Sequence, residues 1–135
     1  MVENKESFSS SAAGKVSPAC LVTRSLKGKN IIISLRGEID LDSASNVYKQ
    51  IRTEIDSSEQ GLLLDLEELD FMDSSGLQIL LRLKERLNKI GKEVLIVNPS
   101  TQIMKLFQLT GFDKLFNIFT DTDEALSYLR NQGST

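Results

Sequence analysis

The run LLLDL at residues 62–66 constrains the fold of this chain more than any other stretch. It is short and almost wholly apolar, which is typical of a central strand that is covered on both of its faces. Further short apolar runs occur at 31–35 and 93–97. Stretches with apolar residues at helical spacing separate these runs, and such alternation favours parallel strands joined by helical crossovers. The chain is therefore predicted to be an α/β protein.

Turn residues and helix caps predict the order of the remaining elements. Residues 20–25 and 31–35 are expected to form a hairpin around a turn at 27–30. Asp42 or Ser43 is expected to cap the helix that follows, because a short side chain with an oxygen accepts a hydrogen bond from a first-turn amide. Farther along we expect a loop or edge segment at 67–70, a long helix at about 75–90 and a strand at 93–97. A helix at about 101–109, a short strand at 115–119 and a final helix follow. Asp121 or Thr122 is expected to cap this final helix, which runs through residue 129.

The expected architecture is one small domain, which suits a chain of 135 residues. It contains a small mixed β-sheet with an N-terminal hairpin and with helices mainly on one face. Residues 18–131 are expected to form this domain. Residues 1–17 are rich in serine, alanine and polar groups and show no periodicity, so they are predicted to be a disordered tail.

The composition excludes several classes of function. The formal net charge is −3, from 16 basic and 19 acidic residues, whereas nucleic-acid-binding proteins usually carry a strongly basic face. No apolar run reaches the roughly 18 residues of a membrane span, and no secretory signal is apparent, so a cytoplasmic protein is expected. With no histidine and one cysteine, the chain cannot form a Ser–His–Asp triad or a zinc site of histidines and cysteines. A carboxylate-only Mg²⁺ site or a Ser–Lys pair stays open but has no supporting motif, and no cofactor is expected.

The segment FMDSSGLQ, residues 71–78, places two serines between a strand-like stretch and the long helix. Ser74 is expected at or near the N-cap, where its oxygen would accept a hydrogen bond from a first-turn amide. A catalytic nucleophile is a second interpretation, but the GxSxG pattern is missing and no histidine can act as its base. Phosphorylation is the third, because a helix N-terminus favours an anion and because more negative charge would sharply change this acidic surface. Capping and phosphorylation are compatible with each other.

The apolar face of the long helix is wider than a helix lying on a sheet requires. At 100° per residue, the contiguous core arc contains Ile79, Leu80, Leu83, Leu87 and Ile90. Leu77 and Leu81 widen this arc. Two explanations stay open, namely burial under a neighbouring helix and a partly exposed apolar edge beside Ser74 to which a partner docks.

Three motifs give the chain a resemblance to a known family. FMDSSGL, preceded by LLLDLEELD, resembles the signature of STAS domains and, more narrowly, of bacterial anti-sigma factor antagonists. LRGEIDLDSA at residues 35–44 is similar to an early element of that family, and IMKLFQLTGFDKLF at residues 103–116 resembles a later one. Three motifs in the right order and spacing are far more specific than DSSG alone. The resemblance covers about residues 19–130.

The resemblance implies a binding switch rather than an enzyme. In that family the unmodified antagonist binds an anti-sigma factor that is also a serine kinase of the GHKL type, and this binding frees a sigma factor. The kinase phosphorylates a serine of the motif, which ends the binding, and a PP2C-type phosphatase restores it. The alternative is a STAS-domain subunit of a different partner-switching, transporter or lipid-trafficking complex.

The resemblance also implies which residues form the site. The phosphate acceptor is the serine directly after the aspartate, which is Ser74, and Ser75 is the second choice. Many antagonists have a glycine where this chain has Gln78, and this difference bears on which kinase docks. The residues expected at the partner surface are Asp40, Asp73, Ser74, Ser75, Gly76, Leu77, Gln78 and Leu81. No nucleic acid, membrane, metal or cofactor is expected at the site.

Overall fold

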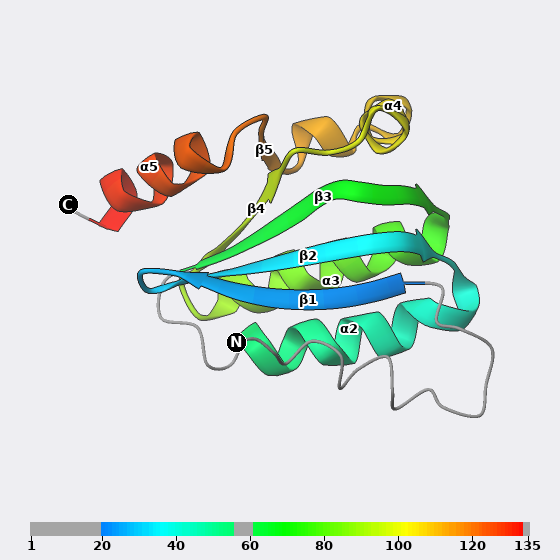
Figure 1. The fold of residues 1–135 in the computed structure, drawn as a ribbon, viewed down its shortest axis with the longest axis horizontal. Coiled ribbons are helices and arrows are strands. Elements are labelled where there is room, and N and C mark those ends of the chain that lie inside the picture. Colours follow the sequence, from blue (N-terminus) through cyan, green and yellow to red (C-terminus); the bar gives the residue numbers. More distant parts are fainter. Residues whose placement is uncertain (1–19, 56–60, 134–135) are drawn as a thin grey trace.

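Five strands form one mixed sheet in the computed structural model, which describes residues 20–55 and 61–133 (Figure 1). The strands lie side by side in the order in which they occur in the chain. β1 and β2 form an antiparallel hairpin, and each later strand pairs in parallel with the strand before it. The tail predicted at 1–17 lies outside the described residues. The elements are β1 (Cys20–Lys27), β2 (Asn30–Ile39), α2 (Leu41–Ile55), β3 (Gly61–Met72), α3 (Ser74–Lys89), β4 (Glu93–Val97), α4 (Thr101–Thr110), η1 (Phe112–Lys114), β5 (Asn117–Phe119) and α5 (Thr122–Gly133).

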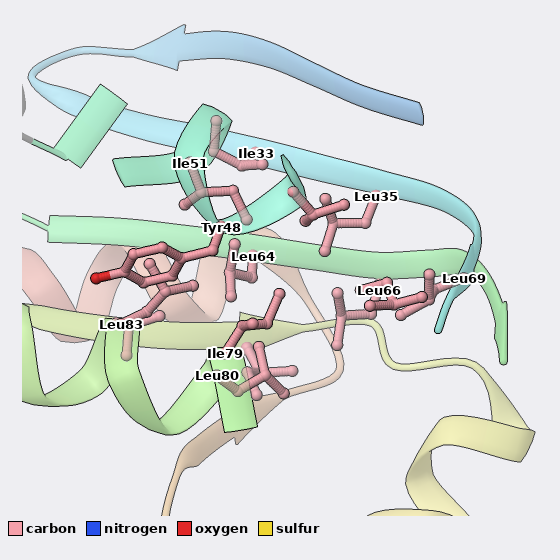
Figure 2. Close-up of a cluster of buried hydrophobic side chains, with 14 of the residues drawn as sticks. Ile33, Leu35, Tyr48, Ile51, Leu64, Leu66, Leu69, Ile79, Leu80 and Leu83 are labelled. Atoms are coloured by element: carbon pink, nitrogen blue, oxygen red, sulfur yellow. The ribbon is translucent and has the colours of Figure 1, made fainter. Parts of the chain in front are cut away.

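Apolar clusters cover both faces of the sheet. Successive residues of a strand point to opposite sides of the sheet, so neighbouring residues of β3 enter different clusters. Leu62 and Leu64 of β3 belong to a large apolar cluster with residues of α2, α3 and α4, whereas Leu63 belongs to a smaller cluster with residues of α5. Figure 2 shows Tyr48 of α2 and Leu83 of α3 beside Leu64 in the larger cluster. The α/β fold, the mixed sheet with its hairpin, the central strand buried on both faces and the helices mainly on one face are thus confirmed.

Helix α3 ends one residue earlier than the sequence indicates, and this removes Ile90 from the core. Ile90 is the C-cap and is 51 % exposed, so its predicted place in the core arc is wrong. The chain turns at Gly91, whose φ of +74° lies in the region that favours glycine. The Gly91 N–H donates to Asn88 O at 3.1 Å and the Lys92 N–H to Leu87 O at 2.8 Å. This pattern is a Schellman motif, which satisfies the last carbonyl groups of the helix.

The buried residues of α2 recur at helical spacing and form one apolar stripe, namely Ala44, Val47, Tyr48, Ile51 and Ile55. Across residues 20–55 and 61–133, no helix has both the length and the apolar character needed to cross a membrane. Cys20 is buried in the larger cluster, and burial raises the pKa of its thiol to about 12.

Strand β3 is longer than the sequence indicates, and its extension leads to the candidate site. Residues 67–70 are predicted as a loop or edge segment, but they belong to the 12-residue strand β3. Pairing with β2 continues past two register shifts, so that Phe71 stands opposite Glu38 and Met72 opposite Ile39. Such irregularities let a strand stay paired where its residues no longer alternate regularly. Residues 67–72, the last six of β3, therefore lie in the sheet rather than in a loop.

Strand β5 is shorter than the predicted strand at 115–119. The 3₁₀ turn before it is closed by the amides of Leu115 and Phe116, which donate to Phe112 O at 3.0 and 3.2 Å. These hydrogen bonds hold the two residues in the turn. The strand therefore begins only at Asn117.

Candidate functional site

The candidate site lies at the edge of the sheet where β2 and β3 end and α2 and α3 begin (Figure 1). Ile39 ends β2 and Met72 ends β3, and the two residues are register partners. The Asp73 N–H donates to Ile39 O at 3.2 Å, which extends the pairing by one residue. Since both strands run in the same direction, the first turns of the two helices that follow are neighbours.

Asp73, and not Ser74, is the N-cap of α3. Its backbone is extended, with φ −102° and ψ −166°, and its Oδ1 accepts a hydrogen bond from the Ser75 N–H at 2.9 Å. The Ser75 hydroxyl donates to the same oxygen. Ser74 is the first helical residue and thus lies next to the N-cap, close to its predicted position, but the capping oxygen that the sequence assigns to Ser74 comes from Asp73. The reason is that Asp73 follows β3 directly and keeps the extended backbone that a cap requires.

Hydrogen bonds hold the pKa of the Asp73 carboxyl below its usual value. The Ser75 hydroxyl makes the largest contribution, partial desolvation opposes it, and the backbone N–H groups of Ser75, Gly76 and Leu41 lower the pKa further. Each of these donors favours the ionised carboxylate. Asp73 is therefore negatively charged at neutral pH. Because Leu41 opens α2, the same carboxylate also connects the first turns of α2 and α3.

The hydroxyl groups of the two serines are in different situations. Ser74 is exposed, and its hydroxyl has no hydrogen-bond partner among residues 20–55 and 61–133. Ser75 is half-buried, and its hydroxyl is occupied by the Asp73 carboxylate. An enzyme that approaches from solvent therefore meets the Ser74 hydroxyl first, whereas a reaction at Ser75 disrupts the cap of α3.

Gly76 allows the first turn of α3 to pack tightly against the ends of β2 and β3. A Cβ atom at this position would lie 2.9 Å from Met72 Cβ and 3.2 Å from Ile39 Cγ2. Met72 Cβ is bonded directly to the backbone, and Ile39 Cγ2 belongs to a fully buried side chain, so neither atom can easily move aside. Gly76 is buried, so it contributes to the site by setting the position of Ser74 rather than by presenting a side chain.

Asp40 caps α2 in the same way at the neighbouring strand end. The Ser43 N–H and hydroxyl donate to Asp40 Oδ1 at 3.0 and 3.1 Å, and the Asp40 N–H donates to Ser43 Oγ at 3.0 Å. This reciprocal arrangement is a capping box. The prediction of Asp42 or Ser43 as the cap is wrong, because α2 already begins at Leu41. Asp40 thus lies at the edge of the sheet that also holds Ser74.

The predicted docking face of α3 is only partly accessible. Leu77 is buried in the larger cluster at 8 % exposure, so burial accounts for this residue. Leu81 is half-buried and packs against the same cluster. Gln78 is exposed one position after Leu77. Of these three side chains, Gln78 and the outer part of Leu81 are available to a partner.

Two exposed apolar residues at this edge were missed by sequence reasoning. Leu41 is 78 % exposed at the start of α2, and Phe71 is 47 % exposed near the end of β3. Met72, the residue after Phe71, is buried, at 3 % exposure. No local signal identifies Phe71, because the register shifts in the pairing with β2 break the alternation along the extended β3. Exposed large apolar side chains next to a candidate site are typical of contact surfaces.

Exposed carboxylates lie near these apolar residues along the chain. We call their set the acidic edge; its exposed members are Glu38, Asp42, Glu67, Glu68 and Asp70. Arg36 is the one basic residue in the segments 36–42 and 65–74. Its Nε lies 3.7 Å from Glu68 Oε1, and a pair with both side chains mostly exposed contributes little stability. The surface beside Ser74 is therefore negative and partly apolar.

Comparisons with known proteins place this geometry in a family. Residues 23–125 match the model of the STAS domain family. The anti-sigma-F factor antagonist RsfB of Mycobacterium tuberculosis is 32 % identical over 101 residues, which cover 73 % of this chain and 80 % of RsfB. The crystal structure of an anti-sigma factor antagonist from Mycobacterium paratuberculosis has a TM-score of 0.72 and 29 % identity, covering 82 % of this chain and 94 % of that chain.

The same fold also occurs inside larger proteins. The murine anion transporter Slc26a9 contains a region with a TM-score of 0.69 and 17 % identity to this chain. The match covers 79 % of this chain but only 18 % of the transporter. At this level of identity, the likeness concerns the fold alone.

Proposed function

Because the chain belongs to the STAS domain family, we propose that it is an anti-sigma factor antagonist controlled by phosphorylation of Ser74. Its unphosphorylated form binds an anti-sigma factor that is also a serine kinase of the GHKL type, and this binding releases a sigma factor. Phosphorylation ends the binding, and a PP2C-type phosphatase restores it. The protein acts in the cytoplasm as a binding switch and not as an enzyme.

The observation that carries this proposal is the exposed hydroxyl of Ser74 beside a cap that does not need it. Asp73 supplies the capping oxygen, so a phosphate on Ser74 leaves the cap of α3 in place. The first turn of a helix also tolerates an anion, because its amides carry partial positive charge. We therefore expect phosphorylation to change the surface of the protein and not its fold.

A phosphate on Ser74 would act through the negative charges that surround it. A phosphoserine carries about −1.5 to −2 charges at neutral pH, and it would stand next to the ionised Asp73 and the acidic edge. A partner that covers Leu41 and Phe71 removes this surface from water. Desolvated like charges cost far more than exposed ones, because the screening by water is lost. The same contact that favours the unmodified protein thus becomes unfavourable after phosphorylation.

The proposed contact surface combines predicted and newly found residues. Leu41, at the start of α2, and Phe71, near the end of β3, supply exposed apolar contact area at the edge of the sheet that holds the acceptor. Gly76 and Leu77 are both buried, so they hold this surface in position without being exposed to a partner. The exposed or half-buried members of the surface are Asp40, Leu41, Phe71, Asp73, Ser74, Ser75, Gln78 and Leu81.

The alternative is a STAS-domain subunit of a transporter, of a lipid-trafficking complex or of another partner-switching system. The relatives named as antagonists are matched over 80 % and 94 % of their own length, whereas the transporter is matched over 18 %. The antagonists are also more similar in sequence. We therefore favour the antagonist and keep the transporter role as an outcome of the test below.

The test is capture of the partner from a bacterial lysate with purified variants. We expect Ser74→Ala to retain a GHKL-type serine kinase and Ser74→Asp to lose it. The matched control is Ser25→Asp, which places the same charge on an exposed serine of the edge strand β1. It should retain the kinase as well as the unsubstituted chain does.

Equal recovery of the kinase by both Ser74 variants contradicts the switch. Recovery of a membrane transporter instead of a kinase supports the alternative. Phosphate mapped by mass spectrometry to Ser75 rather than Ser74 moves the acceptor by one residue.

A further inference from the structure

The first strand starts at the same edge of the sheet that holds Ser74. β1 is antiparallel to β2, and its first residue, Cys20, is the register partner of Gly37, two residues before the end of β2. Figure 1 shows the start of β1 beside the end of β2, on the side from which α2 begins. β3 is the next strand beyond β2, and Phe71 stands opposite Glu38. The segment that precedes Cys20 is therefore tethered beside the candidate site.

Two large apolar side chains are exposed in one part of this edge. Leu41 is 78 % exposed and Phe71 is 47 % exposed. The Leu41 N–H donates to the Asp73 carboxylate, and Phe71 precedes Asp73 by two residues. The two apolar residues are thus held close to the same cap. Covering them removes apolar surface from water, which favours contact with an apolar group that is held nearby.

Residues 1–19 contain a side chain that suits this surface. Phe8 is the one aromatic residue in this segment. The chain between Phe8 and Cys20 can extend to about 40 Å, so its length lets Phe8 reach this edge. The segment contains two lysines and two glutamates, so it brings no net charge to the acidic edge, and its lysines are opposite in sign to the carboxylates there. Length, apolar character and charge thus allow the segment to lie on this surface.

We propose that the surface formed by Leu41 and Phe71 binds the chain's own segment 1–19, with Phe8 as the apolar contact. A group on the same chain needs no second molecule, because a short tether sets an effective concentration on the order of millimolar. A contact that is weak between separate molecules is therefore populated within one chain. Its consequence rests on the proposed function: because the anti-sigma factor uses the same surface, segment 1–19 competes with it and lowers its apparent affinity.

The first experiment places a nitroxide spin label on the segment and records the amide signals of the ¹⁵N-labelled, unphosphorylated full chain. The label is attached through Ser10→Cys, two residues after Phe8. Cys20 stays unlabelled, because its thiol is buried and its pKa is raised to about 12. We expect the label to broaden the amide signals of Leu41 and Phe71 strongly, compared with the same chain after the nitroxide is reduced.

Variants of the labelled chain separate a contact from the tether alone. Phe8→Ser keeps the tether and removes the apolar side chain, so the broadening at Leu41 and Phe71 should fall at least about twofold, in proportion to the population of the contact. Leu41→Ser should lower the broadening at Phe71 in the same way. Leu109→Ser, at an 85 % exposed position of α4, should leave the broadening unchanged. The amide spectrum of each variant reports directly whether it is folded.

The affinity of the captured kinase tests the competition separately. Without the spin label, Phe8→Ser should bind the kinase about two- to tenfold more tightly than the unsubstituted chain does. The proposal is overturned if the label broadens neither Leu41 nor Phe71, if Phe8→Ser leaves the broadening unchanged, or if Phe8→Ser lowers the broadening without raising the affinity. If the chain captures no kinase, the proposed function fails, whereas the broadening still decides whether segment 1–19 binds this surface.

Discussion

Replacing Gly76 with alanine tests how tightly the start of α3 packs against the sheet. The new Cβ would lie 2.9 Å from Met72 Cβ and 3.2 Å from both Met72 Sδ and Ile39 Cγ2. The Sδ atom can rotate away, but the Cβ of Met72 is fixed by its backbone. The first turn of α3 must therefore move away from β3, or β3 must shift.

The expected loss of stability follows from two opposing effects. Alanine in place of glycine inside a helix gains about 1 kcal/mol, whereas forcing an extra methyl group into a packed core costs about 1–3 kcal/mol. The net change is a loss of about 1 kcal/mol in the free energy of unfolding. Because Ser74 belongs to the displaced turn, the rate at which the kinase phosphorylates it should fall as well.

Urea denaturation at equilibrium measures the first effect, and incorporation of phosphate at Ser74 measures the second. The matched control is Gln78→Ala, which changes an exposed position two residues farther along α3. It should alter the free energy of unfolding by less than about 0.5 kcal/mol. If Gly76→Ala is as stable as the unsubstituted chain or more stable, the close packing at this position is refuted.

Three further predictions concern the site. Leu41→Ser and Phe71→Thr should each weaken binding of the captured kinase at least about tenfold with little loss of stability, whereas Leu109→Ser, at an 85 % exposed position of α4, should leave binding unchanged; equal effects of all three would rule out the proposed surface. Since the folded pKa of Asp73 is lowered, its contribution to stability is present above the unfolded pKa of about 3.9 and is lost as the pH falls through the folded value. Asp73→Asn should therefore flatten the decline of the free energy of unfolding as the pH falls below about 4, and an unchanged decline would show that the hydrogen bonds to this carboxylate do not matter. Ser75→Ala should keep phosphorylation at Ser74 while lowering stability through the loss of a donor to Asp73; loss of all phosphate from this variant would assign the acceptor to Ser75.

The fold could be predicted from the sequence wherever an element is marked by apolar residues within a single short segment. The run at 62–66 predicts a strand buried on both faces, and Leu63 and Leu64 do enter opposite clusters. The extension of β3 through 67–70 could not be predicted, because its acidic residues interrupt the alternation. Those residues stay in the strand only because β2 accommodates them with two register shifts, and such pairing depends on a segment distant in the sequence.

The details of the site were harder to predict than its location. The segment DSSG predicts a capped helix start, and three of its side chains can act as a cap. Which of them does so depends on where the extended backbone of β3 ends, and this makes Asp73 the cap and leaves the Ser74 hydroxyl exposed. Likewise, the exposure of Leu41 depends on the packing of two helix ends, which no local pattern in the sequence records.

The most direct test of the switch is the affinity of the captured anti-sigma factor for a chain that carries phosphoserine at position 74, compared with the unmodified chain by calorimetry. We predict that phosphoserine weakens binding at least about 100-fold, because like charges that are buried together cost several kcal/mol. Amide spectra of the two forms should differ only near the starts of α2 and α3. Equal affinities, or a spectrum that changes throughout the sheet, would contradict a switch that acts through surface charge at Ser74.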